Sequence, residues 1–168
     1  EDGSTAPSGT SHADIQKDGC TMSNGEDRKR IVVGVDGSRL SIEALWKARR
    51  LAAVLGCYLE VVTVWEYSIS LAPPVPTDTW SPQTQAELTL REAVEEAFGD
   101  DVPADLKETP LVGLPVELLI EASRGAEMLV VGNRGRGGFA GLLLGSVSST
   151  LAAHAHCPVL IVHRGESA

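Results

Sequence analysis

From Arg28 onward, short apolar runs rich in β-branched residues alternate with segments whose apolar residues recur at helical spacing. The runs are "RIVVGVDGS" (30–38), "YLEVVTVWEY" (58–67), "AEMLVVG" (126–132) and "PVLIVH" (158–163), with a weaker one, "LKETPLVG" (106–113), that Pro110 interrupts. Strands that are apolar throughout, rather than at every second residue, are buried on both faces. This pattern is typical of a parallel sheet.

Helices are predicted between these runs. Residues 39–55 place Leu40, Ala44 and Ala48 on one face, and Gly56 ends that helix. Further helices are predicted at 83–98, at 115–125 and, capped by Ser146, at 146–155. Strands and helices therefore alternate from end to end, which predicts an α/β, Rossmann-like domain with helices covering a parallel sheet.

Composition limits the function classes. At 168 residues the chain is predicted to form one domain, and its 43% hydrophobic content is that of a globular protein. It has no apolar run of about 18 residues, its first residues do not resemble a signal peptide, and its three cysteines are widely spaced. We therefore expect a cytoplasmic protein without a membrane partner. The net charge of −9 disfavours nucleic acid.

The first 27 residues differ from the rest. They hold six acidic residues and one lysine, a net −5, and are rich in Gly, Ser and Thr with little to bury. Such a composition predicts a disordered acidic leader at 1–27, followed by the folded domain at 28–168.

Two loops are candidates for ligand binding. Parallel sheets bind ligands beyond the carboxyl ends of strands, where the strand order reverses. The first strand ends in "GVDGS" and the fourth in "GNRG", so a shared crevice is expected if these strands are neighbours.

The loop after the fourth strand suits phosphate. Its glycines expose backbone amides, Arg134 and Arg136 add positive charge, and Ser146 begins a helix whose first N–H groups lack internal partners. A surface loop without ligand is the alternative interpretation. The Walker A motif is absent, and the GxGxxA at 135–140 follows the fourth strand without the acidic residue that dinucleotide binding needs. NAD and FAD are therefore disfavoured.

The spacing Gly132-x2-Gly135-x9-Gly145-Ser146 resembles the motif of universal stress proteins in their ATP-binding branch. The resemblance covers residues 28–164. It implies a single Rossmann-like domain of the adenine nucleotide α-hydrolase type, with a five-stranded parallel sheet in the order 3-2-1-4-5 and helices on both faces. It also implies ATP, with Mg²⁺, as ligand, and a homodimer formed through the last strand at 158–163.

The same resemblance assigns site residues. Those implied at the nucleoside are Gly34, Val35, Asp36 and, against adenine, Leu59. Those implied around the phosphates and ribose are Gly132, Arg134, Gly135, Arg136, Gly137, Gly138 and Phe139, and at the helix start Gly145, Ser146, Val147 and Ser148. Asp36 is expected to bind the ribose, an adenine donor or a divalent ion, or alternatively to be a turn residue in "DGS".

A binding protein that regulates the stress response is favoured over an enzyme. ATP cleavage needs a group that orients the attacking atom or takes its proton, and residues 128–153 contain no His, Asp or Glu. No catalytic residue is therefore assigned. Slow ATP hydrolysis, self-phosphorylation of Ser146, Ser148 or Ser149, and cyclic AMP or AMP as ligand remain open. The cluster of His154, His156 and Cys157 lacks further ligands, so no metal site is predicted.

Overall fold

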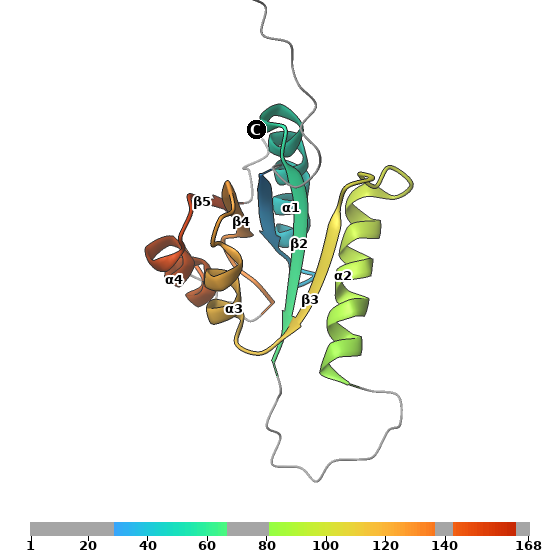
Figure 1. Ribbon diagram of the computed structural model, residues 1–168. Coiled ribbons are helices and arrows are strands. Elements are labelled where there is room, and N and C mark those ends of the chain that lie inside the picture. Colours follow the sequence, from blue (N-terminus) through green and yellow to red (C-terminus); the bar gives the residue numbers. More distant parts are fainter. Residues whose placement is uncertain (1–28, 67–80, 137–142, 164–168) are drawn as a thin grey trace, which may run out of the picture.

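The computed structural model describes residues 29–66, 81–136 and 143–163 (Figure 1). The predicted disordered leader at 1–27 therefore lies outside the described residues. Within the described ranges, no helix is long and apolar enough to span a bilayer.

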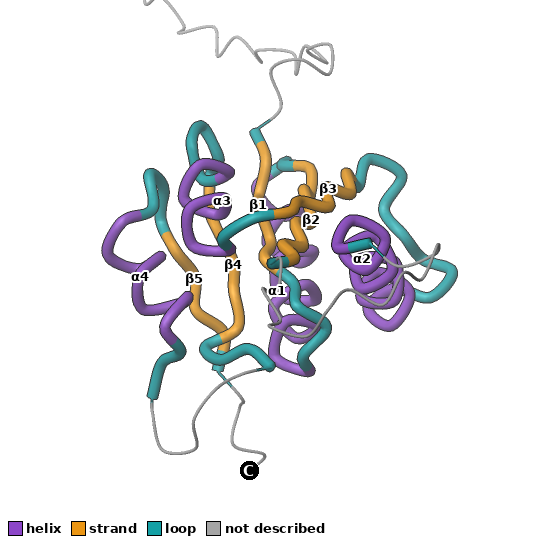
Figure 2. Tube along the Cα trace, turned by 90° about the horizontal axis from the view of Figure 1, so that it is seen from below, coloured by secondary structure: helices purple, strands orange, loops and turns teal. Residues whose placement is uncertain are grey.

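Five strands alternate with four helices along the described chain. They are β1 (Arg30–Gly34), α1 (Arg39–Leu55), β2 (Tyr58–Trp65), α2 (Pro82–Phe98), β3 (Lys107–Val112), α3 (Pro115–Ala122), β4 (Met128–Gly132), α4 (Ser146–His154) and β5 (Val159–Val162). All the strand pairs are parallel, and the order is β3-β2-β1-β4-β5. Figure 2 shows this order running from right to left. The predicted fold and strand order are confirmed.

The sheet has an apolar cluster on each face. On one face α1 and α2 cover Ile31, Val33 and Val61, whereas on the other α3 and α4 cover Val32 and Val131. In Figure 1, α2 stands on one side of the sheet and α3 and α4 on the other. Neighbouring residues of one strand point to opposite faces, which explains why these strands are apolar at every position.

Capping interactions at both ends set the limits of helix α1, which follows β1 in the chain. The Ser38 side chain accepts a hydrogen bond from the Ser41 N–H and caps the first turn, while Gly56, with φ 66°, closes the last turn in the left-handed conformation. The chain then reverses at once into β2, where the Tyr58 N–H donates to the Lys29 carbonyl. The start of α1 is thereby held at the carboxyl end of the sheet.

A charged cluster lies toward the amino ends of the strands. The buried Glu60 of β2 accepts hydrogen bonds from Lys107 Nζ (2.8 Å) and Thr109 Oγ1 (2.9 Å) and forms an ion pair with Arg30 Nε (3.0 Å). Arg30 also donates to the Ala122 and Arg124 carbonyls at the end of α3. One carboxylate thus connects three neighbouring strands, and through Arg30 it connects them to α3.

This cluster predicts an acid-sensitive contribution to stability. Burial by itself raises the pKa of Glu60, but the hydrogen bonds from Lys107 and Thr109 and the charge of Arg30 outweigh it, so the pKa is lowered overall. The unfolded chain therefore takes up a proton at a higher pH than the folded one, and the stabilisation is lost as pH falls through the folded pKa.

We expect Glu60→Gln to lower the free energy of unfolding at neutral pH by about 1–3 kcal/mol, because it leaves Arg30 and Lys107 without their carboxylate. The variant should also lose less stability than the wild type between about pH 5 and pH 3. Urea unfolding across that range measures both effects. Glu92→Gln, on the exposed side of α2, is the control. If wild type and Glu60→Gln lose the same stability in acid, Glu60 is not the source of the acid-sensitive contribution.

Candidate functional site

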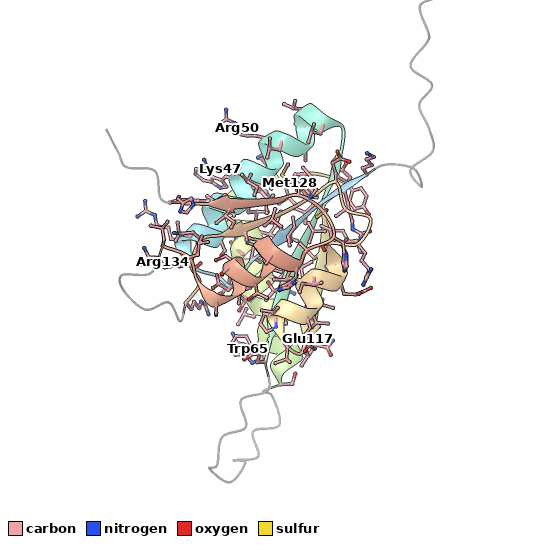
Figure 3. All side chains as sticks on the ribbon, turned by 90° about the vertical axis from the view of Figure 1, so that its left-hand side faces the viewer. Lys47, Arg50, Trp65, Glu117, Met128 and Arg134 are labelled. Carbon is pink, nitrogen blue, oxygen red and sulfur yellow. The ribbon has the colours of Figure 1, made fainter. Side chains whose placement is uncertain are left out.

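A cavity of about 600 Å³ opens at the carboxyl ends of β1, β2 and β4. Figure 3 shows the two ends of the sheet. Met128, at the start of β4, lies higher in the view than Arg134, just beyond the end of β4, and Trp65, at the end of β2. The volume is within the roughly 300–1,000 Å³ of small-molecule sites. The cavity is lined by Gly34, Val35, Asp36, Ser41, Val62, Val64, Trp65, Glu66, Pro115, Leu119, Val131, Gly132, Arg134, Gly135, Arg136, Leu144, Gly145, Ser146, Val147 and Ser148.

One end of the cavity is mostly apolar, although Glu66, directly after β2, also belongs to the lining. Val62 and Val64 of β2 and Val131 of β4 form its floor, and Pro115 and Leu119 of α3 face them. Pro115 occupies the first turn of α3, where its missing N–H is not needed by the helix. This arrangement can hold a flat, weakly polar group such as a heterocyclic base.

The other end is suited to an anion. Helix α4 begins at Ser146, Gly145 is its N-cap, and no side chain caps it, so the predicted cap at Ser146 is wrong. The first amides of a helix lack partners within the helix and carry the positive end of its dipole. Arg134 also lines the cavity, so a negatively charged group finds both a cation and backbone donors here.

Asp36 connects the two candidate loops. Its Oδ1 accepts the Ser38 N–H at 3.0 Å and its Oδ2 accepts the Arg136 N–H at 2.9 Å. Burial raises the pKa of this carboxyl group, but the hydrogen bonds from Ser38, Arg136 and Ser41 outweigh it and hold the pKa below its ordinary value. Asp36 therefore remains ionised at neutral pH. It also acts as the turn residue of "DGS", with Gly37 at φ 74°.

Two glycines of the motif are required by close contacts. A Cβ on Gly135 would overlap the Asp36 carboxylate, and one on Gly132 would lie 3.0 Å from Leu40 Cβ and 3.2 Å from the Leu40 carbonyl oxygen. At Gly145 the nearest atom to such a Cβ would be the Asn133 carbonyl oxygen at 3.4 Å, an ordinary contact. Gly135 thus allows the two loops to approach each other, and Gly132 allows the end of β4 to approach the start of α1.

Most of the predicted residues meet in this cavity. Those among its lining are Gly34, Val35, Asp36, Gly132, Arg134, Gly135, Arg136, Gly145, Ser146, Val147 and Ser148. Gly137, Gly138 and Phe139 lie outside the described residues.

The structure does not support the predicted place of Leu59 beside the ligand. It pairs with Ile31 near the start of β1 and is 2% exposed in the core beneath α1 and α2. The carboxyl end of β2 lies several residues further on, so the structure does not bring Leu59 to the cavity. Val62, Val64 and Trp65 provide the lining from this strand instead.

Sequence reasoning also missed the contributions of α3 and of Asn133. Pro115 and Leu119 belong to an amphipathic helix without a motif of its own, and the Pro at its start was the one available signal. Asn133 stands inside the motif, is 6% exposed and donates from Nδ2 to the Leu143 carbonyl at 3.1 Å.

Comparison with known proteins agrees with this geometry. The model of the universal stress protein family matches residues 27–163. One universal stress protein of Mycobacterium tuberculosis is 36% identical over 152 residues, covering 87% of this chain and 52% of its own length. A second from the same species is 40% identical over 138 residues, covering 80% and 48%. The chain thus spans about half the length of the curated relatives it matches.

Solved structures of the family have the same fold. A universal stress protein in complex with cAMP is 34% identical, with a TM-score of 0.60 over 80% of this chain and 96% of that one. The UspA protein of Lactobacillus plantarum has a TM-score of 0.66 at 20% identity, covering 80% and 97%, and a universal stress protein of Archaeoglobus fulgidus in complex with dAMP has 0.56 at 22%, covering 81% and 98%. The last two likenesses concern the fold alone. The matched family model, the relatives and the sheet order together make this chain a member of the universal stress protein family.

Proposed function

We propose that this chain binds an adenine nucleotide, ATP with Mg²⁺, and acts as a nucleotide-dependent cytoplasmic regulator in the stress response rather than as an enzyme. The observation that carries the proposal is the division of polarity along the cavity of about 600 Å³. Its apolar end lies against β2 and α3, and its other end meets Arg134 and the start of α4. A nucleotide has the same division, with a flat base at one end and phosphates at the other.

In this arrangement the base lies between Val64 and Leu119, and the phosphates lie against the N–H groups of Ser146 and Val147. Arg134 neutralises part of the phosphate charge. The relative that is 34% identical and was solved with cAMP supports an adenine nucleotide as the ligand class. The acidic charge of the chain, −9, argues against nucleic acid as the partner.

Asp36 fits a Mg²⁺ ion only as one ligand among several. Within the described ranges, no group of three or more His, Cys, Asp and Glu side chains could hold a metal ion by itself. Mg²⁺ is commonly held by one or two carboxylates together with substrate phosphates. Among the carboxylates of the lining, Asp36 is the one that would hold it, because it lies beside the loop that carries Arg134. The ion would neutralise phosphate charge beside an ionised carboxylate.

Two carboxylates line the cavity, those of Asp36 and of the exposed Glu66, and the one beside the phosphate end, Asp36, is engaged in structure. Both oxygens of Asp36 accept backbone hydrogen bonds, from Ser38 and Arg136. The hydroxyl of Ser148 donates to the Asn133 carbonyl at 2.8 Å, so it is engaged in structure rather than poised to attack phosphate. Holding a nucleotide is therefore favoured over cleaving it.

Cyclic AMP is a second candidate ligand, favoured by the solved complex of the 34% identical relative. It carries one phosphate on a ring closed with the ribose. ATP can place further phosphates against the start of α4, so the two ligands differ in how much they depend on Arg134.

We also propose a homodimer formed through β5. This strand pairs with β4 on one side and is the last strand of the sheet in the order β3-β2-β1-β4-β5. Val159, Leu160 and Ile161 are only partly buried within the described chain. Such an edge can pair with the same edge of a second copy.

ATP at a hundredfold excess over its Kd should stabilise the fold by about 2.7 kcal/mol, or about 5–10 °C for a domain of this size. The thermal shift should be weaker with GTP and NAD, and Arg134→Gln should reduce it for ATP more than for cyclic AMP. Arg91→Gln, on the exposed face of α2, is the matched control. If no adenine nucleotide shifts the wild type at millimolar concentration, the binding proposal is wrong.

Turnover of ATP should be far below about one per second, the lower end of ordinary enzyme rates. Phosphate release under saturating ATP and Mg²⁺ measures it. Sustained release above that rate would favour an enzyme.

Leu160→Lys should yield a monomer by sedimentation velocity, because it places a charge in the proposed strand pairing. Leu111→Lys on β3, at the opposite edge of the sheet, is a comparable substitution of a half-buried leucine and should leave the dimer intact. Circular dichroism checks that both variants fold. A dimer that persists in Leu160→Lys would remove β5 as the interface.

A further inference from the structure

One residue, Asn133, contacts both described ends of the glycine loop, which is the segment between β4 and α4. Asn133 lies directly after β4, where the loop departs, and its Nδ2 donates to the Leu143 carbonyl at 3.1 Å, where the loop returns. Its own carbonyl accepts the Gly145 N–H at 2.7 Å. The distance between the departing and returning segments is therefore set by contacts of Asn133.

Asn133 is itself fixed to the scaffold. Its N–H donates to the Val162 carbonyl at 2.8 Å, which ties it to the end of β5. The Ser148 hydroxyl donates to its carbonyl at 2.8 Å, which ties it to the first turn of α4. The loop ends are thus held against a strand and a helix.

The Asn133 side chain lies outside the lining of the cavity. Gly132 and Arg134, on either side of Asn133, line the cavity, and Asn133 is 6% exposed and is not part of the lining. Its amide cannot contact a ligand in this arrangement. It can affect a ligand only through the backbone that it holds.

Stability alone does not explain an amide at this position. Asn133 Oδ1 is buried and has no hydrogen-bond partner within the described part of the chain. Burying an unpaired polar atom costs free energy that an apolar side chain would avoid. Among the described residues, the one hydrogen bond that the side-chain amide makes is the bond to the Leu143 carbonyl.

We propose that Asn133 is a positioning residue for the phosphate end of the bound nucleotide. By closing the loop from behind, it holds Arg134 and the first amides of α4 at the spacing that phosphate needs. This inference rests on the proposed nucleotide function. It predicts that the Asn133 side chain matters for phosphates and not for the base, which lies at the α3 end of the cavity.

The test compares ATP with adenosine by isothermal titration calorimetry. Asn133→Ala keeps the backbone contacts and removes the bond to Leu143, so we expect the Kd for ATP to rise about tenfold and the Kd for adenosine to change less than about twofold. Asn133→Asp keeps the size of the side chain but turns an oxygen toward the Leu143 carbonyl. It should weaken ATP binding further while leaving adenosine binding in place.

Ser123→Ala is the control for a merely structural effect. Ser123 is likewise buried, at 0% exposed, and joins two segments by donating to the Ile120 carbonyl at 2.6 Å and accepting the His156 N–H at 2.8 Å, but it does not line the cavity. Its loss should lower Tm without changing the ratio of the two Kd values. If the wild type binds ATP and Asn133→Ala binds both ligands as the wild type does, or weakens both equally, the positioning role is wrong. If the wild type binds neither ligand, the nucleotide function fails and this role fails with it.

Discussion

The hydrogen-bonded pairing of β1 with β4 is the constraint on which the site depends. From β1 the chain adds β2 and then β3 along one edge of β1. It then crosses to the other edge of β1, where it adds β4 and β5. Loops that leave neighbouring parallel strands in opposite directions cannot pack fully over the gap between them. Asp36 after β1 and the glycine segment after β4 are therefore brought face to face over a cavity, although they are about a hundred residues apart in sequence.

The two ends of the sheet each hold a carboxylate, but the two carboxylates have different partners. At the amino ends of the strands, Glu60 is paired with Arg30 and Lys107 and is used for stability. At the carboxyl ends, Asp36 is satisfied by backbone N–H groups and leaves Arg134 available to a ligand. The buried carboxylate of Glu60 and the half-buried one of Asp36 are each tolerable because they are hydrogen-bonded, but only the second arrangement leaves positive charge facing the cavity.

Much of the fold was predictable because each of its signals is local. Strands that are apolar throughout and Gly56 after α1 determine elements without reference to distant residues. The strand order came from the resemblance of the glycine spacing rather than from these local patterns. The placement of Leu59 failed for a physical reason: sliding an apolar strand along its neighbour changes which residue reaches the cavity without changing the pattern. The apolar end of the site was missed because Pro115 and Leu119 read as ordinary parts of a short amphipathic helix.

The contact between Gly132 and Leu40 has a consequence for genetics. Because a side chain at Gly132 would press on the backbone at the start of α1, a substitution there can remove function by loosening the core rather than by disturbing a ligand. A screen for inactive alleles would collect such substitutions as though they marked a binding site. Gly145 has room for a methyl group at ordinary contact distance, so an inactive Gly145→Ala allele that keeps a normal cellular level would be the more informative isolate.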